Sequence, residues 1–264
     1  MGGNAADERS NDSRDDSAAR SESALDSLSR RQLRGTEAIS AALDSNSLVS
    51  LLLLREGSHS PAIDRLLARA RILGIPILEE SEREMRRMSA GQPAADVLAL
   101  EGPPRARTLD ELMAKEGVVF VLAGLRYPSN GGYILRCVEV AGGAGVVLDT
   151  GWGDAERDEA LRVGMRPDRF FSVLRAETRE ALRAARRAGR RIVAVETSGD
   201  FAPWEVDLSK PVVVLVGSET TGIPEPILDE ADEVVCIPIG GFIPSYNVQA
   251  AVGILLGEWM RQNA

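Results

Sequence analysis

Three short polar motifs hold the side chains of this chain that are best suited to chemistry. Each motif lies beside an apolar run, either where a predicted strand ends or where a predicted helix begins. Together they supply one carboxylate, one guanidinium, side-chain amides, hydroxyls and a phenol. The residues are Asn130 and Arg136 in "LRYPSNGGYILRCVEVAGGAG", Gly217, Ser218 and Glu219 in "PVVVLVGSETTGIPEP", and Ser245, Tyr246 and Asn247 in "CIPIGGFIPSYNVQAAVG".

This set of groups can orient a substrate, hold a proton and stabilise a developing oxyanion. A zinc site or a Cys/His nucleophile is disfavoured, because the chain has only one histidine and two cysteines. His59 lies in the polar segment "REGSHSPA", which favours a solvated residue. Cys137 and Cys236 lie in apolar segments, which predict buried, reduced thiols.

Each candidate also has a purely structural interpretation. Asn130, Ser245 and Asn247 precede or open helical patterns and could be N-caps. Glu219 could be a cap or a solvated loop acid. Arg136 is harder to explain in this way, because it falls among Ile134, Leu135 and Val138, where a charge is costly unless it faces a site or a partner.

The elements around these motifs alternate between strand and helix. Continuous apolar strands separated by helical patterns predict a mostly parallel sheet that is covered on both faces. In such sheets ligands bind beyond the carboxyl ends of the strands. Strands are predicted at "VVFVLA", "GVVLDT", "FFSV", "RIVAVE", "PVVVLVG" and "EVVCIPI", and helices at "NGGYILRCVEVAG", "DAERDEALRVG", "AETREALRAARRAG" and residues 246–262.

Changes in composition divide the chain into four parts. Residues 1–30 are rich in Ser, Asp, Arg and Ala and predict a disordered tail. Residues 31–100 read as a small αβαβαβ domain that starts with a helix. Residues 101–116, with Pro103-Pro104, read as a linker, and residues 117–264 form the larger α/β domain.

Charge and hydropathy limit the class of protein. No uncharged run of 18 residues or more predicts a membrane span, and no apolar segment predicts a secretory signal, so a cytoplasmic protein is expected. The formal net charge of −9 argues weakly against nucleic acid. The segment 162–191, however, carries ten arginines and three acids. It is either a solvated helix face or a patch for bidentate phosphate contacts.

A glycine-rich segment at residues 146–160 suggests an alternative function, that of a Rossmann-type methyltransferase. "VVLDTGWGDAERDEA" resembles the cofactor loop of Rossmann-type methyltransferases, with Gly151 and Gly153 in place but Ala155 at the third glycine position. The acidic residue expected about 20 residues later is absent. The Rossmann or dinucleotide-binding alternative is therefore disfavoured.

The three motifs, in this order, resemble those of the SpoU/TrmH family of RNA 2′-O-ribose methyltransferases in the SPOUT superfamily. The spacing from Asn130 to Arg136, the Gly217-Ser218-Glu219 strand end, and Ile237-Pro238 followed by the segment 245–248 carry the likeness. It covers residues 117–263. The block 33–100 is similar to the small RNA-binding domain that precedes the catalytic domain in many members.

The resemblance implies a trefoil-knotted α/β domain that acts as a homodimer, binds S-adenosylmethionine (AdoMet) as methyl donor, uses no metal, and methylates ribosomal RNA rather than transfer RNA. Arg136 would be the catalytic arginine. The alternatives are transfer-RNA methylation and a non-catalytic RNA-binding or assembly factor. The implied supporting residues are Asn130, Glu219, Ser245 and Asn247; the implied AdoMet contacts are Gly217, Ile237, Ile239, Tyr246, Glu196 and Thr197; the expected RNA contacts are Arg162, Arg166 and Arg169.

The chain departs from the family pattern at several places, including "SETTGIPEP" in the second motif and "SAGQPAADVLAL" at the end of the first block. Tyr246 stands where leucine is usual, and Gly131 stands where a larger apolar residue is commoner.

Overall fold

The computed structural model describes residues 30–89, 93–209 and 211–264. The predicted tail therefore lies almost entirely outside the described residues. The described chain forms two compact units, one that ends at Arg105 and one that runs from Ala106 to Ala264.

The first unit contains a mixed four-stranded sheet of order β1-β4-β2-β3. Only β2 and β3 are parallel, while β4 pairs antiparallel with both β1 and β2. The prediction that this unit starts with a helix is wrong for its first four residues, which form β1 because Leu33 is buried and paired with β4. The elements are β1 (Arg31–Arg34), α2 (Gly35–Asp44), β2 (Val49–Arg55), α3 (Pro61–Ile72), β3 (Ile77–Glu80), α4 (Glu82–Met88) and β4 (Val97–Glu101).

The second unit is built on a six-stranded sheet of order β10-β8-β9-β5-β6-β7, in which every pair is parallel. The predicted parallel sheet is thereby confirmed. Its strands are β5 (Val119–Ala123), β6 (Gly145–Asp149), β7 (Ser172–Arg175), β8 (Arg191–Val195), β9 (Val212–Val216) and β10 (Glu233–Val235). Its helices are α5 (Leu109–Met113), α6 (Pro128–Val140), α7 (Asp154–Val163), α8 (Thr178–Arg187), α9 (Glu225–Leu228) and α10 (Val248–Gln262), with short 3-10 turns at Pro167–Arg169 and Pro203–Glu205.

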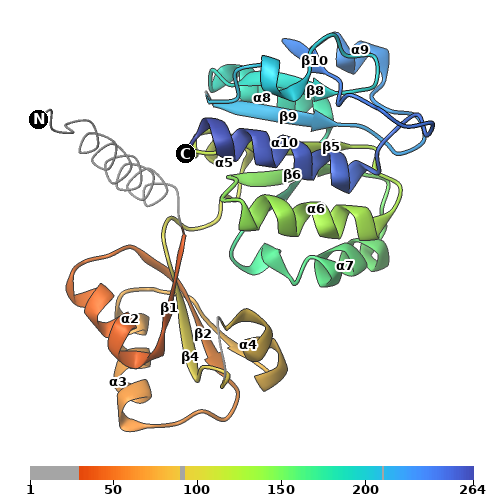
Figure 1. Cartoon of the computed structure of the whole chain (residues 1–264). Helices are drawn as coiled ribbons and strands as arrows, with labels where there is room; N and C mark the ends of the chain where they lie inside the picture. The colour runs from red at the N-terminus through yellow and green to blue at the C-terminus, as the bar shows by residue number, and fades with distance from the viewer. Residues whose placement is uncertain (1–29, 90–92, 210) are drawn as a thin grey trace, which may run out of the picture. The chain divides into compact units, whose positions relative to one another are not determined.

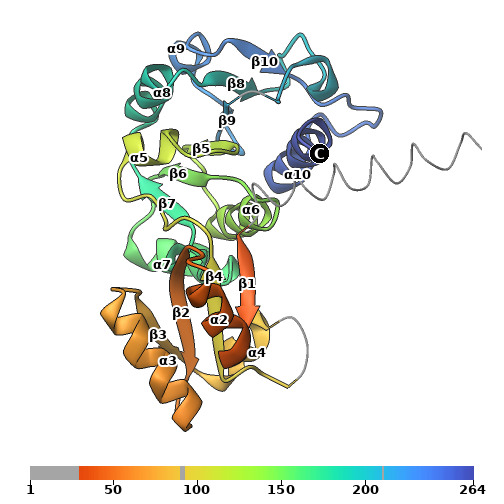
Figure 2. The same ribbon diagram turned by 90° about the vertical axis from the view of Figure 1, so that its left-hand side faces the viewer.

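Helices cover both faces of this sheet (Figures 1 and 2). Alternate side chains of β5 divide between two apolar clusters, with Phe120 and Leu122 in one and Val119 and Val121 in the other. The first cluster contains the apolar sides of α6 and α10, and the second contains those of α5 and α8. The continuous apolar strands are explained by this burial on both faces.

Arg190 is a buried cation between α8 and β8. It is 2% exposed, and its guanidinium donates to the carbonyl oxygens of Met113 and Gly117 at 2.8 Å, of Val212 at 3.2 Å, and of Lys115. Burial lowers the pKa of Arg190 below its ordinary value. The four carbonyl groups lie at the end of α5 and before or at the starts of β5 and β9. By donating to all of them, Arg190 links these three elements.

Replacing Arg190 by leucine is expected to lower the free energy of unfolding by about 3 kcal/mol, because several buried carbonyls lose their donor at once. Urea denaturation would measure the change. Arg183→Leu is the matched control, since Arg183 is exposed on α8 and its loss should change stability by no more than about 0.5 kcal/mol. Equal effects of the two variants would contradict the assigned role.

Among the helices that the structure describes, none combines the length and hydropathy needed to cross a bilayer.

Candidate active site

A cavity of about 470 Å³ lies beyond the carboxyl ends of β8, β9 and β10. Its wall comes from the loops that follow these strands and from the start of α6 and α10. The structure thus brings together residues predicted from three distant motifs. The predicted residues that line the cavity are Asn130, Glu196, Thr197, Gly217, Glu219, Ile237, Ile239, Ser245, Tyr246 and Asn247.

Glu219 caps a helix that is far from it in sequence. Its carboxylate accepts hydrogen bonds from the backbone N–H of Arg126 at 2.8 Å and of Tyr127 at 3.4 Å, immediately before α6. It also accepts one from Asn130 Nδ2 at 2.8 Å. A carboxylate at this end of α6 also has favourable electrostatics with the helix dipole. Glu219 is therefore held in its ionised form at the cavity wall.

The balance of effects on Glu219 predicts its pH response. Burial alone would raise the pKa of this carboxyl group, but the hydrogen bonds from Arg126, Asn130 and Tyr127 lower it below its ordinary value of 4.5. Because the pKa is lower in the folded state, the stabilisation is fully present above pH 4.5. It is lost as the pH falls through the folded-state pKa.

The stability advantage of the wild type over Glu219→Gln is accordingly expected to be constant above about pH 5 and to shrink below it. Thermal unfolding of both proteins between pH 3 and pH 8 would measure this difference. Glu180→Gln, which removes an exposed carboxylate from α8, reports the effect of losing charge alone. A difference between wild type and Glu219→Gln that grows on acidification would contradict the assignment.

Asn130 and Asn247 extend this polar chain across the cavity. Asn247 Nδ2 donates to Asn130 Oδ1 at 3.4 Å, and Asn247 Oδ1 caps α10 by accepting from the Gln249 N–H at 2.9 Å. The N-cap interpretation thus holds for Asn247 and is wrong for Asn130. Helix α6 begins at Pro128, with Tyr127 as its N-cap, so the Asn130 amide is free to hold Glu219.

Close backbone approach explains the glycine at the end of β9. A Cβ on Gly217 would lie 2.4 Å from the carbonyl carbon of Gly222, on the returning side of the same loop. Glu196 then joins this loop to the one after β8, since its Oε1 accepts from the Ile223 N–H at 2.6 Å and its Oε2 from the Thr197 N–H at 3.2 Å. Two walls of the cavity are fixed to each other through one carboxylate.

The loop after β10 forms the third wall and is exposed from Pro238 to Asn247. Ser245 lies on it beside the cavity. The phenol of Tyr246 donates to the Pro238 carbonyl oxygen at 3.2 Å and so closes the loop on itself. The leucine expected from the family pattern could not make this hydrogen bond. Tyr246 therefore helps to position this loop. The phenol could have suggested such a role, whereas the family pattern, which expects leucine here, could not.

Arg136 does not line the cavity. It is exposed on α6, so the interpretation that it shares the buried register of Ile134, Leu135 and Val138 is wrong. Asn130 and Arg136 are six residues apart, which separates them by about 120° around a helix. Within one chain, the two side chains therefore face different directions.

Gly131 is explained by Trp152. A Cβ on Gly131 would lie 2.3 Å from the Cη2 atom of Trp152, whose ring is buried against α6. The indole Nε1 donates to the Arg126 carbonyl oxygen at 3.2 Å. The segment Gly151-Trp152-Gly153 therefore supports the first motif, which gives the glycine-rich sequence a packing role.

The predicted RNA contacts lie away from the cavity wall. Arg162 and Arg166 both pair with Asp158, at 3.2 and 2.6 Å. Arg169 ends the 3-10 turn Pro167–Arg169 that follows α7. The structure does not bring these three residues into contact with the cavity.

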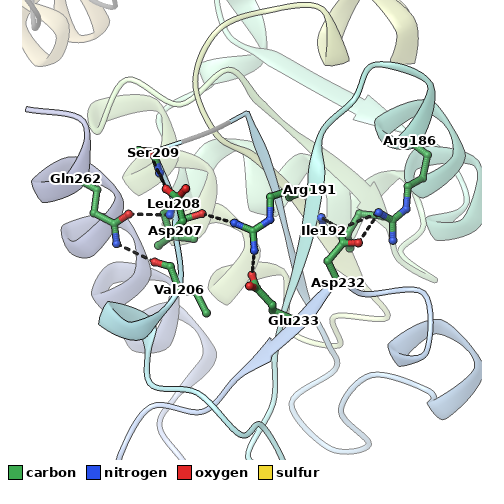
Figure 3. A network of polar contacts seen from close by, with 10 residues as sticks. All are labelled: Arg186, Arg191, Ile192, Val206, Asp207, Leu208, Ser209, Asp232, Glu233 and Gln262. Carbon is green, nitrogen blue, oxygen red and sulfur yellow. Dashed lines mark hydrogen bonds and ion pairs between the residues drawn. The ribbon is translucent and has the colours of Figure 1, made fainter.

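Other arginines of the segment 162–191 are engaged within the protein. Figure 3 shows Arg186 against Asp232, with Nη1 2.6 and 2.7 Å from the two carboxylate oxygens, and Arg191 between Glu233 and the Asp207 carbonyl oxygen. Hydrogen bonds from Arg186 and the Ile192 N–H outweigh burial and lower the pKa of Asp232. The phosphate-contact interpretation therefore does not extend to the whole run of arginines.

The predicted burial of the cysteines is wrong. Cys137 is exposed on the outer face of α6, and Cys236 is half-buried at the end of β10. Apolar neighbours in sequence did not bury Cys137, because two residues along α6 place it about 160° around the helix from the buried Leu135.

Comparison with known proteins places the chain among RNA-modifying enzymes. Residues 117–257 match the SpoU rRNA Methylase family. A protein from Mycobacterium ulcerans (strain Agy99), described as an uncharacterized tRNA/rRNA methyltransferase, is 32% identical over 253 residues, which span 88% of this chain and 81% of that protein.

Two solved structures resemble the chain over nearly its whole length. An AdoMet-bound rRNA methyltransferase from Sinorhizobium meliloti is 26% identical, with a TM-score of 0.55 and 96% of each chain covered. An RNA 2′-O ribose methyltransferase is 27% identical, with a TM-score of 0.51 and 97% of each chain covered. These likenesses agree with the parallel α/β sheet described above.

Proposed function

The chain belongs to the SpoU rRNA methylase family of RNA methyltransferases, and on that premise we propose that it transfers a methyl group from AdoMet to a ribose 2′-hydroxyl, in ribosomal rather than transfer RNA. The observation that carries the proposal is that ten residues predicted for this activity, from distant parts of the chain, line one and the same cavity. The enzyme is proposed to act in the cytoplasm, with a trefoil-knotted second unit and an RNA-binding first unit.

The cavity wall fits AdoMet in its chemistry. Buried apolar side chains of Val216 and Ile237 offer a surface for a flat base, and Glu196 and the backbone at Gly217 offer polar groups beside it. Thr197, Ile239 and Tyr246 complete the proposed contacts. When bound, AdoMet supplies an electrophilic methyl group on its sulfonium. The task left to the protein is to align the 2′-hydroxyl and to stabilise the oxygen as its proton leaves.

Arg136 is proposed to stabilise that developing oxyanion. A guanidinium keeps its proton at any physiological pH and is therefore suited to donate hydrogen bonds rather than to act as a base. Asn130, Glu219, Ser245 and Asn247 are proposed to hold the ribose end of the substrate, and the ionised Glu219 can accept a proton.

The outward position of Arg136 supports a shared site. A second copy of the chain, packed on the outer side of α6 and α10, would carry its own Arg136 toward the cavity of the first. That side exposes Val140 and Met260, and a Cβ at Gly253 or Gly257 would meet no atom within 4 Å, which leaves a strip open to close approach. We therefore propose a homodimer in which each Arg136 serves the partner's cavity.

The test of the function is a methylation assay with labelled AdoMet and unmodified 16S rRNA, 23S rRNA and tRNA transcripts. Digestion to nucleosides and mass spectrometry are expected to yield 2′-O-methylnucleosides from an rRNA. A methyl group on a base, or product from tRNA alone, would overturn that part of the proposal. Calorimetry with AdoMet separates an enzyme from a non-catalytic assembly factor, which need not bind it.

A further inference from the structure

The dipeptide Arg126-Tyr127, between β5 and α6, has all of its backbone polar groups engaged. Both N–H groups donate to the Glu219 carboxylate. The Arg126 carbonyl oxygen accepts from the Trp152 indole at 3.2 Å, and the Tyr127 carbonyl oxygen accepts from the Asn130 N–H at 3.1 Å and the Gly131 N–H at 3.3 Å. The backbone is thus held by three separate elements.

The two side chains, in contrast, are left open. Tyr127 is 50% exposed and lines the cavity. Arg126 is exposed, and within the part of the chain that the structure describes its guanidinium has no ion-pair partner. Folding has fixed the main chain here while leaving an aromatic ring available at the cavity wall and an exposed cation next to it in sequence.

Tyr127 lies on a different wall from the proposed AdoMet contacts. Those contacts follow β8, β9 and β10, whereas Tyr127 follows β5 and lies beside Asn130 and Glu219. This is the side from which, under the proposed function, the ribose must approach.

We infer that Tyr127 stacks on a base of the RNA next to the target ribose and that Arg126 contacts an adjoining phosphate. The inference rests on the proposed function, since it names residues that position that substrate. A ring on a fixed backbone suits this role, because stacking on any base is favourable and little conformational freedom is lost. The guanidinium beside it suits a phosphate.

The experiment compares Tyr127→Phe, Tyr127→Leu and Arg126→Gln with the wild type. Tyr127→Leu is expected to raise the KM and Kd for rRNA by roughly ten-fold to a hundred-fold, the range of one lost stacking contact. Tyr127→Phe keeps the ring and should stay within about three-fold of wild type. Arg126→Gln should weaken RNA binding and lower its salt dependence. The Kd for AdoMet should change in none of them.

Trp204→Leu is the matched control, because Trp204 is 56% exposed and does not line the cavity; its RNA affinity should equal that of wild type. A raised Kd for AdoMet in Tyr127→Leu, or equal RNA affinity for Tyr127→Leu and wild type, would overturn the inference.

Ultraviolet cross-linking to the same unmodified transcripts keeps this test separate from the methylation assay. A cross-link in the tryptic peptide that contains Tyr127 is expected with AdoMet-free protein. Were no transcript methylated, the proposed reaction would fail while the cross-link still supported an RNA contact. Cross-links that map only elsewhere would refute the contact itself.

Discussion

Replacing Arg136 by alanine is expected to lower kcat for methyl transfer by at least about 100-fold, the usual cost of losing one donor to an oxyanion. The Kd for AdoMet should stay within a few-fold of wild type, because Arg136 does not line the cavity of its own chain and is proposed to act, in the partner's cavity, on the ribose oxygen and not on AdoMet. Single-turnover kinetics with saturating RNA would measure the chemical step, and calorimetry would measure AdoMet binding.

Arg183→Ala controls for the loss of an exposed arginine elsewhere on the same unit and should leave both quantities unchanged. Unchanged turnover in Arg136→Ala would show that Arg136 does not take part in methyl transfer. A large loss of AdoMet affinity would assign it to binding instead.

The second large effect is complementation between two inactive chains. Gly217→Ala should abolish AdoMet binding, because its Cβ would meet backbone atoms of Gly222 and Ile223 at 2.4 and 2.5 Å and the loop must move. Co-expression of Arg136→Ala and Gly217→Ala chains with different affinity tags allows the heterodimer to be purified. If each Arg136 serves the partner's cavity, one of its two sites is intact, and about half of the wild-type activity is expected.

The reciprocal heterodimer makes the result decisive. A wild-type chain paired with a chain that carries both substitutions should be inactive if Arg136 acts across the interface, because the one functional cavity lacks its arginine. If Arg136 acts within its own chain, the two results exchange: the first heterodimer is inactive and the second keeps about half of the activity. A protein that sediments as a monomer would contradict the shared site directly.

The parallel sheet could be predicted from the alternation of apolar strands and helices, and the position of the cavity from the motifs at the strand ends. Apolar runs such as residues 212–216 are buried on both sides, and the motifs after them meet at one edge of a parallel sheet. Long-range partners could not be predicted in the same way. Nothing in the sequence near Glu219 indicates that its carboxylate accepts from the Arg126 N–H, 93 residues earlier in the chain. The position of Asn130 favours it as the cap of α6, although Tyr127 is the N-cap.

Helix phase caused the other errors. Apolar neighbours in sequence suggest the apolar register for Arg136 and burial for Cys137, yet both lie on the exposed side of α6. The sequence does not show whether the arginines of segment 162–191 are solvated, paired or bound to phosphate, because acids that pair with them, such as Asp232 and Glu233, lie on other elements. Tyr127 was missed because an aromatic residue before a helix carries no signal until its exposure and its place at the cavity are known.

The contact between Gly131 and Trp152 limits which substitutions the first motif tolerates. Because the indole occupies the volume that a side chain at position 131 would need, a larger residue at 131 cannot be introduced alone without displacing part of the first motif. The two sites should therefore be epistatic, and a larger residue at 131 becomes tolerable only after the ring at 152 has been lost. Gly131 and Trp152 therefore act as a pair, in which a substitution at position 131 requires a compensating one at position 152.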